Sequence, residues 1–219
     1  MSCYKSKKGK CVSQITRPLG EYSYFVRDNI ALSIIRKVLA FKEPLMNSTV
    51  YSRNYFGIST TASGASSYFN NSLKVLTSKG NLYMKKNDIS DKDSVLNKYK
   101  VIVTYAMSGG NKPTAEGNYQ ILSSLMSLGP DEACSETYLL LDTFDSLNEA
   151  NNLIQYMSSK FARFLLLQAL TSIHITKDKF CFVPVQDFSK SWTDEELYTK
   201  YNLSQEEINF IETMIKPME

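Results

Sequence analysis

The sequence predicts an α+β protein, with an irregular mixed β-sheet and loops in the middle, one long packed helix, and two short C-terminal helices. Three observations lead to this class. Short runs rich in β-branched and aromatic residues, separated by glycines, fill residues 50–143. Apolar residues then recur at helical spacing from about residue 146 to 170. Two Ser/Thr-x-x-Glu capping signatures follow near the C-terminus.

The length and composition are those of a folded domain. The chain has 219 residues, of which 43% are hydrophobic and 12% aromatic. This is enough apolar surface for a normal core and one large domain or two small ones. No apolar run approaches the roughly 20 residues that a transmembrane helix needs, and the N-terminus lacks the apolar stretch of a secretory signal. We therefore expect a cytoplasmic protein with no membrane partner.

The first expected segment is a flexible basic lead-in over residues 1–20, which are polar and rich in lysine. The remaining residues, 21–219, form the expected domain. Its first element is a helix from Val26 to Ala40, where apolar residues recur at helical spacing before Pro44. A basic β-rich part then covers about 45–143, and a helical acidic part covers about 144–219.

The strand candidates of the β-rich part share high β-propensity and neighbouring glycines. They are Phe56–Thr61, Ser72–Thr77, Leu82–Met84, Tyr99–Tyr105 and the more apolar Glu136–Asp142. In the second part, capping pairs predict where helices begin. The pair Ser146 and Glu149 predicts the start of the long helix, which runs to about Leu170. A short strand is expected around Phe180–Val183. The pairs Thr193 and Glu196, and Ser204 and Glu207, predict the starts of the two final helices.

Charge is distributed unevenly along the chain. Residues 1–130 hold 18 Lys/Arg and 7 Asp/Glu, a net charge of +11, whereas residues 131–219 hold 7 and 15, a net charge of −8. Such asymmetry favours a polyanion as the partner of the first part and solvent or another protein beside the second. A solvated surface of uneven charge is the alternative.

No complete catalytic centre, cofactor loop or metal site is evident. The four cysteines (Cys3, Cys11, Cys134 and Cys181) form no CxxC pair, so reduced thiols are expected. The single histidine, His174, would have to serve every catalytic triad or dyad, which leaves an independent hydrolase as a weak alternative. The glycine-containing loop from Ser108 to Pro113 matches neither a Walker motif nor a dinucleotide fingerprint.

Binding to double-stranded DNA has distributed support. Lysines and arginines are spread over the expected loops and strand edges of residues 1–112, with aromatic and amide side chains between them. Cationic side chains position a protein on phosphates, whereas Arg, Asn and Gln can contact base edges. The candidate DNA-binding residues are Arg53, Asn54, Lys74, Lys85, Lys86, Lys100 and Lys112. Substitution of Arg53 or Lys112 is expected to weaken binding.

The C-terminal sequence resembles a known family. The segments that carry the resemblance are Cys134–Asp145, Glu149–Ile154, Lys160–Leu165, Phe182–Ser189, Trp192–Tyr198 and Ile208–Glu219. Together they look like the C-terminal target-recognition region of bacterial type II restriction–modification N6-adenine DNA methyltransferases. The resemblance is strong over about residues 134–219 and weaker upstream. It implies sequence-specific recognition of DNA.

The resemblance does not extend to the chemistry of that family. Its methyl-transfer motif, a tetrapeptide of the Asn/Asp-Pro-Pro-Tyr/Phe type, and its glycine-bearing cofactor loop are both missing from the sequence. S-adenosylmethionine would therefore belong to a separate methyltransferase domain. We expect either a recognition module without activity of its own, or a subunit of a split adenine-specific methyltransferase or restriction enzyme that works with a methyltransferase or nuclease chain. A detached remnant is the third alternative.

Overall fold

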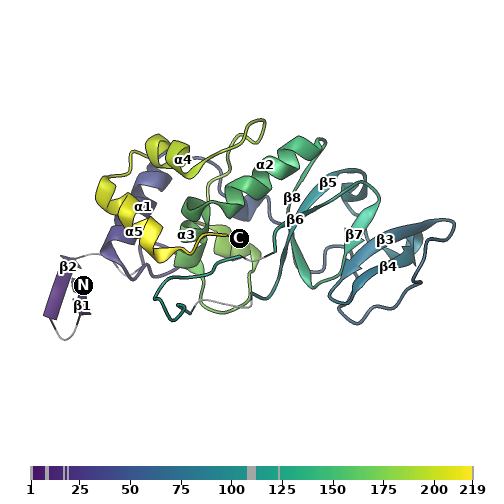
Figure 1. Ribbon diagram of the computed structural model, residues 1–219, viewed down its shortest axis with the longest axis horizontal. Coiled ribbons are helices and arrows are strands. Elements are labelled where there is room, and N and C mark those ends of the chain that lie inside the picture. The colour runs from purple at the N-terminus through teal and green to yellow at the C-terminus, as the bar shows by residue number, and fades with distance from the viewer. Residues whose placement is uncertain are drawn as a thin grey trace.

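The computed structural model describes residues 2–7, 10–16, 18, 20–107, 112–122 and 124–218. The molecule is elongated, with helices at one end, a small sheet at the other and a second sheet between them (Figure 1). This is the α+β class predicted from the sequence. Within the described residues, none of the helices combines the length and apolar character that crossing a bilayer requires.

The first residues form regular structure where the sequence predicted a lead-in without any. Strands β1 (Ser2–Lys7) and β2 (Lys10–Thr16) pair as an antiparallel hairpin beside the helical end (Figure 1). Helix α1 (Asn29–Ala40) begins three residues later than predicted, because Asp28 is its N-cap and accepts a hydrogen bond from the Ile30 amide at 2.9 Å. Of its apolar stripe, Ile34, Ile35 and Val38 are buried, and Ile30 and Leu39 are half-buried.

The β-rich part contains two three-stranded sheets rather than the single mixed sheet that was predicted. The outer sheet is mixed, in the order β4-β3-β7, and the central sheet is antiparallel, in the order β6-β5-β8. The strands of the outer sheet are β3 (Ser72–Thr77), β4 (Gly80–Lys85) and β7 (Glu132–Cys134); those of the central sheet are β5 (Tyr99–Thr104), β6 (Met126–Leu128) and β8 (Tyr138–Phe144).

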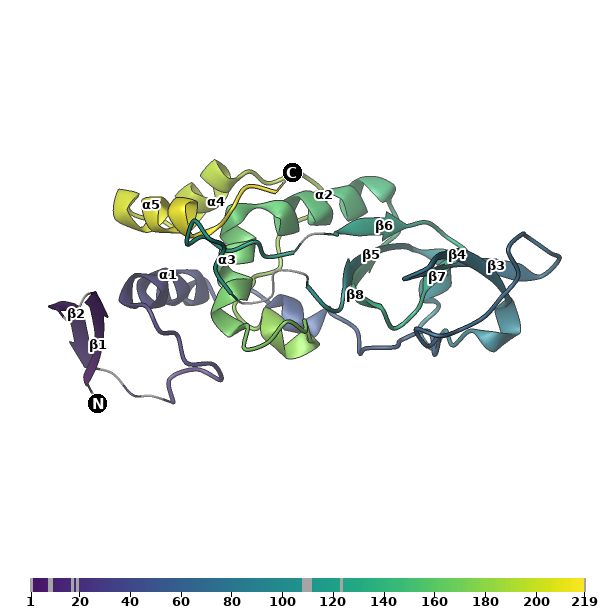
Figure 2. The same cartoon turned by 60° about the horizontal axis from the view of Figure 1, so that its bottom comes forward.

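The central sheet is buried on both faces. Side chains of a strand alternate between faces, so Val101 and Val103 of β5 enter the core shared with the helices, whereas Ile102 enters the core shared with the outer sheet. On β8, Leu140 joins Ile102 in that second core. Helix α2 (Leu147–Ser158) packs across the first face (Figure 2). The helical part and the outer sheet therefore pack on opposite faces of the same central sheet.

Two predicted strands are wrong. Residues Phe56–Thr61 are turns and irregular backbone, because Asn54 and Gly57 adopt left-handed conformations with φ of 59° and 71° that a strand excludes. Around Phe180–Val183 the chain forms a 3₁₀-helix, Lys177–Phe180, whose last two residues are buried, and then irregular backbone. Other single-turn 3₁₀-helices cover Met46–Ser48, Lys86–Asp88 and Val95–Asn97.

The predicted long helix is two helices, α2 and α3 (Lys160–Ala169). They meet at Ser159, whose ψ of 150° is extended and interrupts the helical hydrogen bonds. The Ser159 hydroxyl accepts a hydrogen bond from the Ala162 amide at 3.1 Å. The Asp194 carboxylate accepts hydrogen bonds from the amides of the first two residues of α3, Lys160 at 3.0 Å and Phe161 at 2.8 Å. The first three free amides of α3 are thus all satisfied by side chains.

The two final helices begin where the sequence predicted. Helices α4 (Asp194–Lys200) and α5 (Gln205–Met214) each carry the expected capping box. Ser146 is the N-cap of α2 as predicted and accepts the Asn148 amide at 3.2 Å. Glu207 of α5 also accepts hydrogen bonds from Lys37 at 2.7 Å and Ser33 at 2.8 Å, which fix α1 against α5.

Candidate nucleic-acid interface

A groove of about 800 Å³ opens where the helical part meets the β-rich part. The segment 48–55 and Gly57 form one wall, Ser90, Lys92 and Asp93 a second, and Asp142 and Lys177 complete the lining. The wall segment is held against the edge of the central sheet, because the Tyr51 amide donates to the Leu140 carbonyl at 3.0 Å. We call this site the junction groove.

Arg53 is held at the junction groove by three groups. Its guanidinium carbon lies 4.2 Å from the centre of the Tyr105 ring, a cation–π contact. Its Nη2 lies 3.3 Å from a carboxylate oxygen of Glu136, and its Nε donates to the Glu136 carbonyl at 3.5 Å. The side chain remains 45% exposed, so Arg53 is oriented on one side and open to a ligand on the other.

Asn54 and Tyr55 follow directly in the wall. Asn54 is exposed and takes the left-handed conformation that asparagine tolerates better than most residues. The Tyr55 hydroxyl donates to the Asp93 carboxylate at 3.1 Å and accepts from the Asp93 amide at 3.1 Å. Burial, with the neighbouring Asp93, raises the pKa of Tyr55 to about 12. The rings of Tyr51 and Tyr55 meet edge to face with centres 4.9 Å apart.

Two lysines of the junction groove were missed in the sequence. Lys92 and Lys177 are exposed, and neither forms an ion pair with any residue that the structure describes. They lie 85 positions apart in the sequence and come together only in the fold, so no local pattern could have joined them. With Arg53 they place three cations around one groove.

Asp142 brings a carboxylate into this basic setting. It lies at a β-bulge of β8: Val101 pairs with Asp142 while Ile102 pairs with Leu140, so Leu141 is the extra residue. Leu141 is fully buried in the helical core, whereas Asp142 lines the groove. Partial burial raises the pKa of the Asp142 carboxyl, against hydrogen bonds from Thr143 and Thr49 that lower it.

Four of the seven predicted residues lie outside the junction groove. On the outer sheet, Lys74 pairs with Glu132 at 2.8 Å, and Lys86 pairs with Asp131 at 3.3 Å. Lys85 is exposed at the end of β4, and Lys112 is exposed in a loop. The structure therefore brings Arg53 and Asn54 together and leaves these lysines elsewhere on the surface.

Lys100, the seventh, is not on the surface at all. Its side chain is fully buried in β5, and its ammonium donates to the Leu96 carbonyl at 3.1 Å. Burial lowers the pKa of Lys100 to about 8, although the carboxylates of Glu132, Asp131 and Asp91 act in the opposite direction. A buried ammonium cannot reach a phosphate, so the prediction that Lys100 contacts DNA is wrong.

His174 has no catalytic surroundings in the described part of the chain. Its ring stacks on Tyr105, with centres 4.9 Å apart and planes at 21°. No described acid or thiol bonds to the ring, and among described residues no three His, Cys, Asp or Glu side chains gather as metal ligands. The glycine-containing loop lies largely outside the described residues, as do the side chains of Cys3 and Cys11. Cys134 and Cys181 are free thiols.

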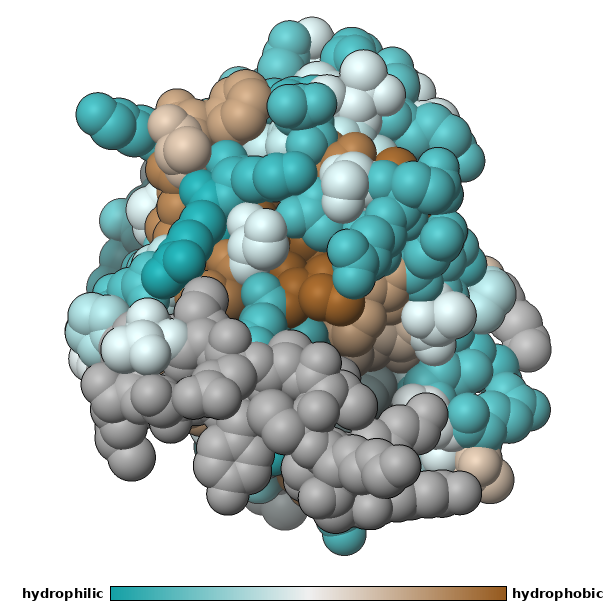
Figure 3. All heavy atoms as spheres, turned by 90° about the vertical axis from the view of Figure 1, so that its left-hand side faces the viewer, coloured by the Kyte–Doolittle hydropathy of each residue, from teal (hydrophilic) through white to brown (hydrophobic). Residues whose placement is uncertain are grey.

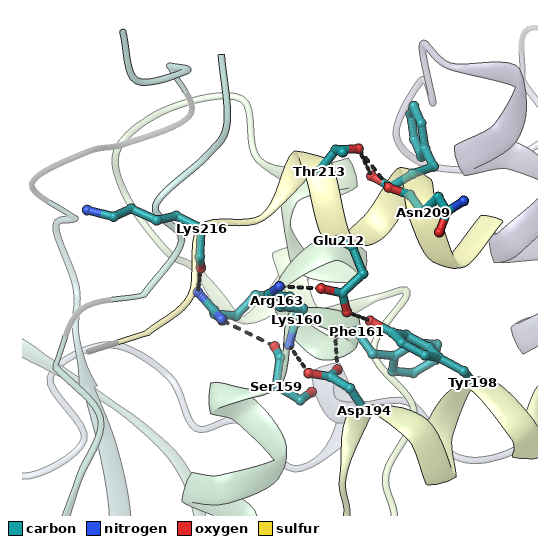
Figure 4. Close-up of polar contacts among 11 residues, drawn as sticks. Ser159, Lys160, Phe161, Arg163, Asp194, Tyr198, Asn209, Glu212, Thr213 and Lys216 are labelled. Carbon is teal, nitrogen blue, oxygen red and sulfur yellow. Dashed lines mark hydrogen bonds and ion pairs between the residues drawn. The ribbon is translucent and has the colours of Figure 1, made fainter. Parts of the chain in front are cut away.

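Several motifs behind the family resemblance meet in one network of the helical end (Figure 4). The Arg163 guanidinium donates to the carbonyls of Lys216 at 2.7 Å, Ser158 at 3.0 Å and Ser159 at 3.2 Å. Glu212 accepts from Tyr198 at 2.8 Å and pairs with Lys160. These contacts, with the Asp194 cap, tie α3, α4 and α5 together. Residues of these motifs therefore hold the helices of this end together.

Comparison with known proteins assigns the chain to no family. No protein-family model matches the chain, and no curated protein matches it significantly.

Proposed function

We propose that the chain is a sequence-specific DNA recognition module of a restriction–modification system, without a methyl-transfer or cleavage site of its own. The observation that supports it is the junction groove, where Arg53, Lys92 and Lys177 surround the exposed amide of Asn54 and the half-buried rings of Tyr51 and Tyr55. The link to restriction–modification rests on the sequence resemblance alone. Double-stranded DNA in the cytoplasm is the proposed ligand.

Each class of groove residue has a part in such binding. Lysines and arginines neutralise phosphates and release counterions, so they supply affinity that falls with salt. Asn54 offers both a donor and an acceptor to a base edge. Arg53 is the best placed of the cations, because Tyr105 and Glu136 hold its planar group in one orientation before a ligand arrives.

The test compares two triple variants that remove the same charge. In the first, Arg53, Lys92 and Lys177 are changed to alanine; in the second, Lys79, Lys85 and Lys86 on the β3–β4 hairpin are changed. Binding to a randomised 30-base-pair duplex is measured by fluorescence anisotropy from 50 to 300 mM salt. We expect the groove variant to lose at least about tenfold in affinity, with a salt slope shallower by about two to three.

The possible outcomes distinguish an error in the binding site from an error in the proposed function. If the hairpin variant loses affinity and the groove variant does not, DNA binding stands and the junction groove is the wrong surface. If the unchanged protein binds the duplex no better than it binds polyglutamate, the proposed function is contradicted. Lys112→Ala, in the exposed loop, tests the remaining cation predicted from sequence.

A subunit role in a split enzyme is the second candidate. The helical end lies away from the junction groove, carries the acidic first turns of α4 and α5, and shows a small apolar area among hydrophilic residues (Figure 3). Such a surface suits a protein partner better than DNA. We expect co-expression with any methyltransferase or nuclease chain that is encoded beside its gene to give one complex in size-exclusion chromatography. Separate elution of the two chains contradicts this role.

A further inference from the structure

We infer that Asp142 is a specificity-determining residue of the junction groove, whose carboxylate accepts a hydrogen bond from the exocyclic amino group of cytosine or adenine. The inference rests on the proposed function and names the base chemistry that the groove selects. Asp142 was not among the residues predicted from the sequence.

The backbone of β8 places this carboxylate. Leu139, Leu140 and Leu141 alternate between the two cores, and Asp142 is the next residue of the strand. At Asp142 the register against β5 shifts by one residue, which marks the β-bulge. The Asp142 side chain lines the groove instead of a core. An acid therefore stands directly after three buried leucines, where β8 meets the 48–55 wall.

The carboxylate keeps acceptor capacity for a ligand. Its Oδ1 accepts from the Thr143 amide at 2.8 Å, and the Thr49 side chain is a second hydrogen-bond partner. A carboxylate has about four acceptor positions. Asp142 forms no ion pair with a described residue, although three cations line the same groove. Among the described cations, Lys98 acts favourably on this negative charge without forming an ion pair with it.

This chemistry suits a base and not a phosphate. A carboxylate repels the DNA backbone, so it is unfavourable in a groove that merely collects phosphates. Cytosine N4 and adenine N6 are the amino donors of the major groove, and Asp or Glu accepting from cytosine N4 is a recurrent pairing. Arg53, Lys92 and Lys177 would hold the flanking phosphates while Asp142 discriminates between bases. Guanine O6 and thymine O4 would both face it as acceptors and be disfavoured.

The experiment removes the amino group from the base and the Asp142 carboxylate from the protein, separately and together. The unchanged protein first selects its preferred site from a randomised duplex pool. Each cytosine of that site is then replaced singly by 2-pyrimidinone, which lacks N4, and each adenine by purine, which lacks N6. At one position the analogue is expected to weaken binding about ten- to one-hundredfold for the unchanged protein and not at all for Asp142→Ala. Which analogue has this effect tells cytosine from adenine.

Two further variants complete the design. Asp88→Ala removes an exposed carboxylate outside the groove and is expected to keep the full analogue response. Asp142→Leu fills a similar volume without an acceptor and gives the same test if the alanine variant does not fold. Equal analogue sensitivity in the unchanged protein and in the folded Asp142 variant overturns the inference while DNA recognition stands. Failure of the unchanged protein to bind any duplex overturns both.

Discussion

Replacing Arg163 with alanine is expected to lower the free energy of unfolding by roughly 3 kcal/mol. Arg163 is 2% exposed and donates to three carbonyls that belong to the α2–α3 junction and to the segment after α5. Its loss leaves these carbonyls without their charged donor and opens a cavity between helices. Urea denaturation with an unchanged m-value measures the difference.

Lys160→Ala is the matched control for Arg163. It removes one positive charge from the same helix, but Lys160 pairs with the partly exposed Glu212 at the surface of the network. Such pairs contribute about 0–1 kcal/mol. Equal losses for the two variants would show that the buried guanidinium does not hold the helical end together.

Replacing Lys100 with methionine is expected to stabilise the protein at pH 7 by roughly 2 kcal/mol. The fully buried ammonium carries an unfavourable desolvation energy, which lowers its pKa to about 8. Methionine fills a similar space without charge, at the cost of one hydrogen bond to the Leu96 carbonyl. Thermal and urea unfolding of the two proteins give the difference.

The same lysine predicts a particular pH dependence. Between about pH 8 and the ordinary lysine pKa of 10.5, the unfolded chain keeps a proton that folded Lys100 has lost. The stability of the unchanged protein should therefore rise through this window relative to Lys100→Met, and the advantage of the methionine variant should shrink. Lys79→Met, at an exposed position, should show no such change. Parallel stability curves from pH 7 to 10 would contradict the burial of a charged Lys100.

Local signals in the sequence were sufficient where the structure depends on neighbouring residues. The capping boxes at Thr193 and Ser204 each involve a glutamate three positions away, so their pattern predicts both helix starts correctly. Strand β3 has the predicted bounds Ser72–Thr77, because its β-rich run and the turn at Gly80 that follows it are local signals. These are interactions that a short window of sequence contains.

Contacts between distant segments account for what was missed. The apolar face from Leu153 to Leu165 is continuous, so the helical pattern does not indicate the break at Ser159. The Asp194 carboxylate that caps α3 lies more than 30 residues later in the sequence. Lys92 and Lys177 meet at one groove only because the central sheet brings their loops together. Lys100 was different, since its position among Val101, Ile102 and Val103 already indicated a strand buried on both faces.

Strand β5 has consequences for how the chain can be divided. Its consecutive residues Val101 and Ile102 belong to different cores, one completed by helices and the other by the outer sheet. A cut near residue 144, the predicted boundary between the β-rich and helical parts, would separate β8 from α2 and leave an apolar sheet face exposed in one fragment. The basic and acidic parts are therefore two surfaces of one cooperative folding unit, rather than modules that recombination could exchange separately.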